Sequence, residues 1–235
     1  KGGSMHLIDI DANVIAAVPI VGSTIPIGVG AAWANKLKNK KNIVVIFFGD
    51  GATEQGVFYE SLNFAALHKL RVLFVCENNK YSVYSNLKKR QALHNQIRNS
   101  AKSFGLKTYY FKNDDLMNIF IKSKKIILDI RKKSFPVFFE IETYRQIEHC
   151  GPANDDKLNY RKKEKINFWK KNCQVKINKS LFLKKGIISE KDLNKIEKNI
   201  KKEIFNAFSY AFKSKFPLKN QLQKNIFKKK LWIEG

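Results

Sequence analysis

Two short runs of consecutive apolar residues constrain the fold of this chain more than any other feature of its sequence. The first run spans residues 43–48 (Ile-Val-Val-Ile-Phe-Phe) and the second spans residues 72–76 (Val-Leu-Phe-Val-Cys). Apolar, β-branched runs of this length are typical of strands that are buried on both faces, as in a parallel sheet. Residues 53–67, between the runs, carry apolar side chains along one side of a predicted helix. This segment therefore predicts a right-handed strand–helix–strand unit.

Other segments continue this alternation of strands and helices. A helix is expected to begin at Ser23 or Thr24, because a hydroxyl cap followed by proline in the first turn is typical of a helix start, and to continue to residue 37. The predicted fold class is α/β, with a parallel sheet that is flanked by helices. The further expected elements are strands over 107–111 and 136–141 and helices over 87–104 and about 114–131.

Two glycines, Gly28 and Gly30, lie inside the helix that ends near residue 37. Glycine in the interior of a helix costs about 1 kcal/mol relative to alanine. The pair therefore suggests that another backbone comes very close to this helix.

The chain after residue 165 is rich in lysine and is expected to be helical. We predict one α/β domain over residues 1–165 and a helical C-terminal extension of that domain over residues 166–235. Ser189 and Asp192 resemble a capping box, which starts the last helix. An apolar stripe on that helix is expected to pack on another surface.

Composition excludes several classes of protein. Hydrophobic residues make up 44% of the 235 residues, and no apolar run approaches the ~18 residues of a membrane span. The three cysteines include no Cys-x-x-Cys pair, so neither a disulfide scaffold nor a zinc site is expected, and a reducing compartment, the cytoplasm, is the default. The net charge of +25 comes from scattered lysines without a nucleic-acid motif, so nucleic acid is not an expected partner.

Polar residues follow both apolar runs, at the point where each predicted strand ends. Asp50 lies between two glycines after the first run, and Asn79 ends the sequence Glu-Asn-Asn after the second. Ligands of parallel α/β sheets bind beyond the carboxyl ends of the strands, so we expect both side chains to lie exposed at that edge, near each other. Mg2+ takes oxygen ligands and usually binds substrate phosphates as well. The spacing therefore predicts a magnesium–diphosphate site.

Six short motifs, in the same order along the chain, resemble one family. Residues 49–79 resemble the thiamine diphosphate motif. The surrounding segments resemble the alpha subunit of the first component of 2-oxo acid dehydrogenase complexes, such as pyruvate or acetoin dehydrogenase. The resemblance covers residues 1–165 closely and the remainder loosely. The motifs are Lys1–His6, Ile20–Gly22, Ile25–Gly28, Gly49–Ala52 with Gln55 and Gly56, Glu77–Asn79 with Tyr81, and Thr143–Arg145 with His149.

The resemblance implies a role for each matching residue. Magnesium would be held by the side chains of Asp50 and Asn79 and by the carbonyl of Tyr81. His149 would be the catalytic loop histidine, which reaches the diphosphate and the reacting centre. The other implied cofactor contacts are the Pro19 carbonyl on the aminopyrimidine amine, Val21 under the bent cofactor, and Gly49, Gly51 and Ala52 along the diphosphate.

The implied activity is that of an oxidoreductase alpha subunit, which decarboxylates a 2-oxo acid and passes the acyl group to lipoamide. The implied partners are a beta subunit, which supplies the activating glutamate in a two-plus-two heterotetramer, and a lipoyl-bearing acyltransferase component. The family carries a Tyr-Arg pair upstream of the motif that begins at Lys1. The sequence is therefore expected to lack an N-terminal part. Because the activating glutamate comes from the beta subunit, the chain is also expected to be inactive without that subunit.

The sequence leaves the identity of the substrate open. Residues 146–152 depart from the pyruvate dehydrogenase pattern, and Cys150 replaces the serine that mitochondrial enzymes phosphorylate. Pyruvate, acetoin, a branched 2-oxo acid or an unusual acyl donor therefore fits.

Two alternative functions also stay open. The first is a carboligase or transketolase-like acyl transfer on the same cofactor, which would use the same motifs. The other alternative is a non-catalytic basic scaffold fragment, against which the intact Asp50, Asn79 and His149 speak.

Overall fold

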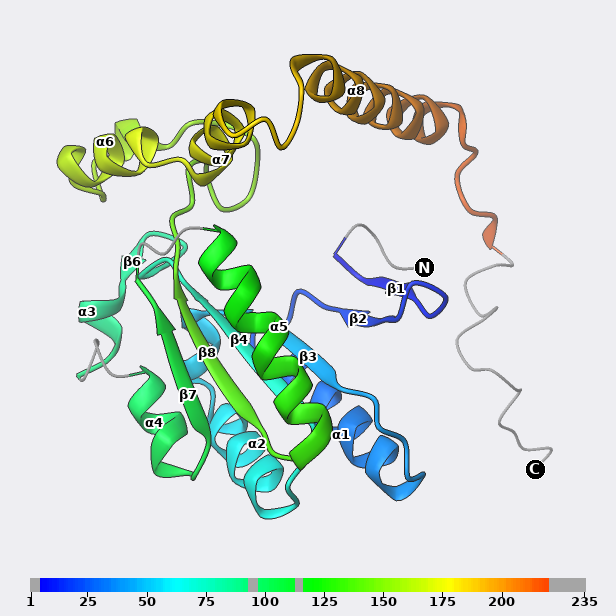
Figure 1. The fold of residues 1–235 in the computed structure, drawn as a ribbon, viewed down its shortest axis with the longest axis vertical. Coiled ribbons are helices and arrows are strands. Elements are labelled where there is room, and N and C mark those ends of the chain that lie inside the picture. The colour runs from blue at the N-terminus through cyan, green and yellow to red at the C-terminus, as the bar shows by residue number, and fades with distance from the viewer. Residues whose placement is uncertain (1–4, 93–96, 113–115, 220–235) are drawn as a thin grey trace. The chain divides into compact units, whose positions relative to one another are not determined.

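A parallel sheet forms the centre of residues 2–174, which are one of two compact units in the computed structural model. The structure describes residues 5–92, 97–112 and 116–219. The predicted α/β class with a parallel sheet is confirmed, because every neighbouring pair of strands in this sheet runs parallel. The strands, in their order across the sheet (Figure 1), are β3 (Val44–Gly49), β4 (Val72–Asn78), β8 (Val137–Glu142) and β7 (Lys107–Phe111).

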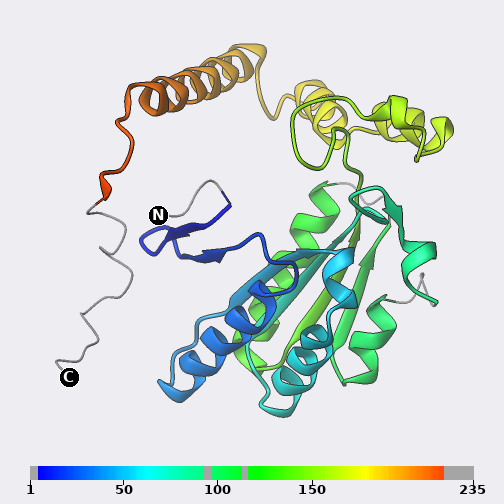
Figure 2. The ribbon, with the colours of Figure 1, turned by 180° about the vertical axis from the view of Figure 1, so that it is seen from behind.

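Helices cover both faces of this sheet. On one face lie α1 (Thr24–Leu37), α2 (Gly56–Leu67) and α4 (Ile97–Ser103), and on the other lies α5 (Leu116–Lys133), as Figures 1 and 2 show from opposite sides. Phe138 belongs to the core under α1, α2 and α4, whereas the next residue, Phe139, belongs to the core under α5. Successive side chains of a strand point to opposite faces, so β8 serves both cores.

The prediction that residues 43–48 are buried on both faces is wrong. Ile46 and Phe48 are buried under α1 and α2, but Val45 is 40% and Phe47 is 64% exposed. Within the described residues β3 is an edge strand, and the buried side chains of α5 cluster with β4, β8 and β7. The prediction holds for residues 72–76, because β4 lies in the interior of the sheet and its Val72–Cys76 are buried throughout.

Two predicted helices differ from the observed ones. The helix expected over 53–67 begins at Gly56, after a turn of 3-10 helix over Asp50–Glu54. The segment 87–104 contains two helices, because α3 is a single turn and α4 begins at residue 97. The short elements of this unit are β1 (Leu7–Asp9) and β2 (Val14–Ala17), β5 (Tyr81–Ser82) and β6 (Ser85–Asn86), α3 (Leu87–Arg90), a 3-10 turn (Asp156–Leu158) and α6 (Lys163–Lys171).

The second unit begins at residue 175 and contains most of α7 (Gln174–Lys184) and all of α8 (Glu190–Lys213). The predicted capping box is confirmed, since Ser189 and Asp192 bond to each other's backbone at the start of α8. Residue 165, where the sequence suggests a change of composition, lies within α6, and the division into domains stays a prediction. In the part of the chain that the structure describes, no helix is long and apolar enough to cross a membrane.

The two glycines of α1 have different surroundings. A Cβ on Gly28 would lie 2.6 Å from Cγ1 and Cδ1 of Ile46, whereas a Cβ on Gly30 would meet nothing within 4 Å. The close neighbour of Gly28 is therefore a side chain of β3 rather than a backbone, and no close neighbour of Gly30 lies within the described residues. The absence of a side chain at Gly28 lets α1 lie directly on β3.

The two glycines therefore predict opposite effects of the same substitution. Gly28→Ala should lower the free energy of unfolding by about 1–2 kcal/mol, because overpacking costs about 1–3 kcal/mol and exceeds the helix-propensity gain. Gly30→Ala should raise it by about 0.5–1 kcal/mol, since alanine loses less backbone entropy on folding. Urea unfolding of both variants measures the difference. Changes of the same sign in both would contradict this account of α1.

Candidate functional site

The carboxyl ends of β3, β4 and β8 lie side by side, which places three loops at one edge of the sheet. Gly49 at the end of β3 is the register partner of Glu77, and Asn78 at the end of β4 is the register partner of Glu142. Asp50 and Asn79 therefore follow adjacent parallel strands, which the sequence had left open. The segment after β8 adds the loop that carries His149.

A cleft of about 1020 Å3 runs along the edge strand β3 and reaches these loops. Its walls come from the β1–β2 hairpin, the segment before α1, the edge strand β3 and the three loops. Among its lining are all nine residues that the sequence assigned to a site: Pro19, Val21, Gly49, Asp50, Gly51, Ala52, Asn79, Tyr81 and His149. Ser82, Val83 and Arg145 also line the cleft, and the sequence did not single them out as site residues.

The turn that carries Asn79 is held by hydrogen bonds on both sides. Asn79 Oδ1 accepts from the backbone N–H of Tyr81 at 2.8 Å, and Asn78 Oδ1 accepts from that of Lys80 at 3.0 Å. Asn78 Nδ2 also donates to Oε1 of buried Glu140 at 2.9 Å, which ties the turn to β8. Glu140 was missed by sequence reasoning, although a charge inside the apolar run 137–141 was a visible signal.

Asp50 is buried, which corrects the expectation that its carboxylate lies exposed at the strand end. Its side chain is only 1% exposed, because the 3-10 turn folds back over the end of β3. Oδ2 forms an ion pair with Arg90 Nη2, and Oδ1 is buried without a hydrogen-bond partner among the described residues. An anionic oxygen left unpartnered in the interior is costly, so Asp50 Oδ1 fits a cation ligand.

Gly51 has no room for a side chain. A Cβ at this position would lie 2.9 Å from Ser82 Oγ, because the β5–β6 hairpin packs against the turn that follows β3. The turn therefore presents bare backbone to the cleft beside Asp50. Such backbone can approach a phosphate group closely, which is the property that the Gly-Asp-Gly motif suggested.

His149 lies on a loop that is closed at its base by Glu148. The Glu148 backbone N–H donates to the Ala153 carbonyl at 2.9 Å, and the Ala153 N–H donates back to Glu148 Oε1 at 3.1 Å. A Cβ on Gly151 would meet the same carboxylate, so a larger residue there would displace the end of the Glu148 side chain. Arg145 Nη1 lies 3.5 Å from His149 Nδ1. The histidine is thus attached to a loop of defined shape at the mouth of the cleft.

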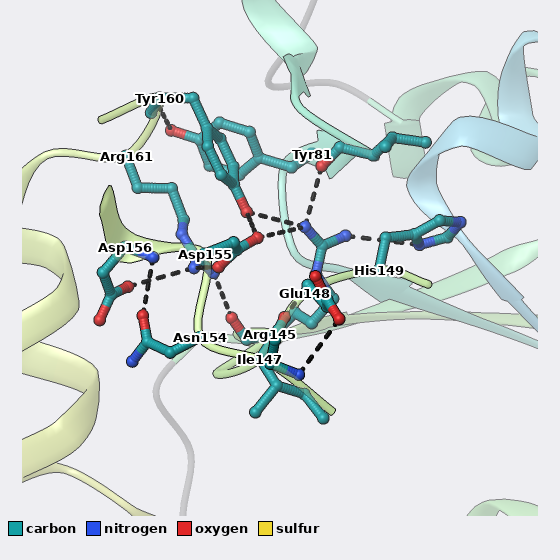
Figure 3. Close-up of polar contacts among 12 residues, drawn as sticks. Tyr81, Arg145, Ile147, Glu148, His149, Asn154, Asp155, Asp156, Tyr160 and Arg161 are labelled. Carbon is teal, nitrogen blue, oxygen red and sulfur yellow. Dashed lines mark hydrogen bonds and ion pairs between the residues drawn. The ribbon is translucent and has the colours of Figure 1, made fainter. Parts of the chain in front are cut away.

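A cluster of buried ionic side chains holds this loop from behind (Figure 3). Asp155 accepts hydrogen bonds from Arg161 and from the Tyr160 hydroxyl, and Arg161 also donates to the Arg145 carbonyl. Arg145 Nη2 donates to Tyr160 Oη at 2.8 Å and to the Val83 carbonyl at 2.9 Å, which joins the loop to the β5–β6 hairpin. Burial and the bond to Asp155 raise the pKa of Tyr160 to about 12.

Glu148 predicts a measurable effect on the order of this loop. Glu148→Ala should increase amide hydrogen exchange over residues 148–153 by about tenfold or more, since a lost hydrogen bond of about 1–1.5 kcal/mol changes a local opening constant by that factor. Glu148→Gln keeps a carbonyl oxygen for the Ala153 N–H and should exchange almost as slowly as the unmodified chain. Equal exchange in the alanine variant would show that other contacts order the loop.

A parallel α/β sheet with a largely apolar cleft that reaches polar loops at the carboxyl ends of its strands defines a class, that of cofactor- or nucleotide-binding α/β domains. Comparison with known proteins narrows the class. The chain belongs to the family of the dehydrogenase E1 component, whose family model matches residues 1–219.

The chain is similar to curated alpha subunits of the pyruvate dehydrogenase E1 component. It is 33% identical to that of Rickettsia bellii over 97% of its own length and 68% of the relative's. It is 30% identical to that of Zymomonas mobilis, of which it covers 63%, and 30% identical to the mitochondrial protein of Dictyostelium discoideum, of which it covers 61%. A solved Mycobacterium smegmatis structure, provisionally described as a thiamin diphosphate-dependent enzyme, overlaps 57% of this chain and 24% of its own, with a TM-score of 0.46 at 21% identity.

Proposed function

We propose that this chain is the alpha subunit of a thiamine diphosphate-dependent 2-oxo acid dehydrogenase, which decarboxylates a 2-oxo acid and passes the acyl group to lipoamide. The observation that carries the proposal is the convergence of the nine predicted site residues on one cleft, with Asp50 and Asn79 following adjacent parallel strands. The relatives, which carry the name pyruvate dehydrogenase E1 component subunit alpha, support this assignment.

The chain's own residues would hold the cofactor as follows. Asp50 Oδ1, Asn79 Oδ1 and the Tyr81 carbonyl would hold Mg2+, while the backbone of Gly49, Gly51 and Ala52 would face the diphosphate. Thiamine diphosphate, when bound, supplies the carbon nucleophile and the electron sink of the decarboxylation. In the same cleft Val21 would support the bent form of the cofactor, and the Pro19 carbonyl would hold its aminopyrimidine amine.

The contact with Arg145 fits one tautomer of a neutral His149. A guanidinium only donates, so Nδ1 of His149 would be the acceptor of the 3.5 Å contact and the proton would lie on Nε2. Nε2–H is then available to donate to a diphosphate oxygen or to a developing oxyanion in the cleft. We propose that His149 acts in this way as the catalytic loop histidine.

We further propose that the active protein is a heterotetramer with a beta subunit, which contributes the activating glutamate, and that a lipoyl-bearing acyltransferase component accepts the acyl group. The names of the relatives as alpha subunits support a partner of this kind. A cytoplasmic location stays a prediction.

Calorimetry on the full-length alpha subunit with its beta partner tests the proposal. We expect thiamine diphosphate to bind in the presence of Mg2+ and not after its removal by a chelator. Absence of magnesium-dependent binding would contradict the assignment. Turnover of a 2-oxo acid with a lipoyl domain as acceptor then tests the reaction. Formation of a C–C bond with an added aldehyde acceptor, without a lipoyl domain, would instead favour a carboligase or transketolase-like transfer on the same cofactor.

A further inference from the structure

The carboxylate of Asp50 already has a cation beside it, the guanidinium of Arg90. Arg90 Nη2 pairs with Asp50 Oδ2, Nη1 pairs with Glu54 Oε1, and Nε donates to the Ser85 carbonyl at 3.1 Å. The Arg90 side chain is mostly buried, and it stands behind Asp50 rather than among the residues that line the cleft. This single side chain therefore bridges the two acidic residues of the turn that follows β3.

The bridge is part of a larger set of contacts between α3 and that turn. Gln91 Nε2 donates to Thr53 Oγ1 at 2.8 Å and lies 3.3 Å from Glu54 Oε1. Thr53 Oγ1 in turn donates to the Asp50 carbonyl at 2.7 Å. These contacts attach α3 to the turn Asp50–Glu54 and thereby fix the position of the Arg90 guanidinium next to Asp50.

We infer that Arg90 is an internal counter-ion that competes with a divalent cation for Asp50 and thereby makes cation binding depend on the diphosphate. The inference rests on the proposed function, because it takes Asp50 as a ligand of that cation. The Asp50 carboxylate is almost fully buried, and without a counter-ion its charge would be strongly destabilised there. Arg90 neutralises this charge.

Charge explains why the cation and the diphosphate become coupled. Asp50, Glu54 and Arg90 together carry one net negative charge, so a divalent ion alone would leave the group with one net positive charge beside a guanidinium that repels it. A diphosphate brings additional negative charge to the same place and removes this penalty. By linkage, each ligand then raises the affinity of the site for the other by the same factor.

Glu54 has a distinct part in this arrangement. It pairs with Arg90 Nη1 while Arg90 Nη2 pairs with Asp50 Oδ2, so the guanidinium divides its charge between two carboxylates. Glu54 therefore favours a cation at the unpartnered Asp50 Oδ1, because it takes up part of the positive charge that would otherwise act on Asp50 alone. Loss of Glu54 would leave Arg90 with Asp50 as its main anionic partner.

Binding of Mn2+ alone to the cofactor-free full-length chain, purified with its partner subunit, tests the inference. Electron paramagnetic resonance measures the free ion during titration, with and without inorganic pyrophosphate as the probe for the diphosphate, and a protein-free titration corrects for the Mn2+ that pyrophosphate binds in solution. In the unmodified protein, pyrophosphate should tighten Mn2+ binding by about tenfold or more, the size of a typical coupling between sites. In Arg90→Gln, Mn2+ alone should bind about tenfold more tightly, and the effect of pyrophosphate should shrink by the same factor.

Three further variants separate this role from a general effect of charge or of folding. Lys89→Gln removes a charge from the exposed neighbour on α3 and should leave Mn2+ binding unchanged. Arg90→Lys keeps the charge but cannot bridge two carboxylates, so it should shift Mn2+ binding in the same direction by less. Glu54→Gln should weaken Mn2+ binding when Arg90 is present and have little effect in the double variant with Arg90→Gln.

The outcomes distinguish this inference from the proposed function. Mn2+ affinity that is unchanged or weaker in Arg90→Gln and Arg90→Lys, with binding still lost in Asp50→Asn, would overturn the counter-ion role and leave the metal site standing. Absence of Mn2+ binding in the unmodified protein, even with pyrophosphate, would overturn both. Tighter binding in both Arg90 variants, with no change in Lys89→Gln, would support the inference.

Discussion

Replacement of Asp50 by asparagine is expected to abolish magnesium-dependent binding of thiamine diphosphate and to leave the fold in place. The amide is neutral and is a poorer ligand for a hard cation, so we expect the affinity to fall at least ~100-fold, which corresponds to about 3 kcal/mol. The amide oxygen can still accept a hydrogen bond from Arg90, which retains its ion pair with Glu54. Calorimetry with Mg2+ present measures the affinity, and circular dichroism checks the fold.

A matched control for Asp50→Asn is Glu60→Gln on α2, which removes one negative charge from an exposed position. This variant should bind the cofactor like the unmodified protein, because screening makes an exposed charge at a distance nearly irrelevant to a buried site. Unchanged cofactor affinity in Asp50→Asn would count against the metal assignment. A loss of equal size in both variants would indicate a general effect of charge.

The second large effect is expected at Asp155, which anchors the ion-pair cluster behind the His149 loop. Asp155 is 4% exposed and pairs with Arg161, which is also buried. Removal of one member of a buried pair costs about 3–5 kcal/mol, and here Arg161 would keep only the contact with Asp156 at 3.2 Å. Asp155→Ala should therefore lower the free energy of unfolding by roughly that amount and expose residues 145–161 to limited proteolysis, because Arg145 and Arg161 lose their common partner.

Asp156 provides the comparison within the same turn. Its side chain is 22% exposed and pairs with Lys170 and, at 3.2 Å, with buried Arg161, and the bond to Lys170 lowers the pKa of Asp156. A lowered pKa in the folded state contributes stability that is present at neutral pH and is lost as the pH falls through that value. Because Arg161 keeps Asp155 as its partner, Asp156→Ala should lower the free energy of unfolding less than Asp155→Ala. Equal losses at both positions would refute the special role of Asp155.

The sequence was most informative where the signal is local. The strands β3, β4, β7 and β8 and the capping box of α8 were predicted because apolar runs, turn residues and caps act over a few residues. The paired motifs at Asp50 and Asn79 were also sufficient to predict that two loops meet at one edge, since parallel strands must end on the same side.

Other properties depended on contacts between segments far apart in the chain. The exposed face of β3 follows from its place at the edge of the described sheet, and a run of apolar residues carries no information about that place. Gly28 contacts a side chain of another element, Ile46, and the helix sequence does not specify that neighbour. Glu140 reaches Asn78 across 62 residues, so its role became visible only when β8 was seen beside β4.

The sequence by itself determined the α/β class, the elements of the sheet and the motif residues of the site, because periodicity and strand-end polarity are written in consecutive residues. Only the tertiary structure decided that Asp50 is buried, that Arg90 neutralises it, and that Asp155 and Arg161 hold the His149 loop. Burial and ion pairing depend on which surfaces meet after the chain has folded. Short motifs therefore predict the residue types of the candidate site, whereas contacts between distant segments determine its charge and its shape.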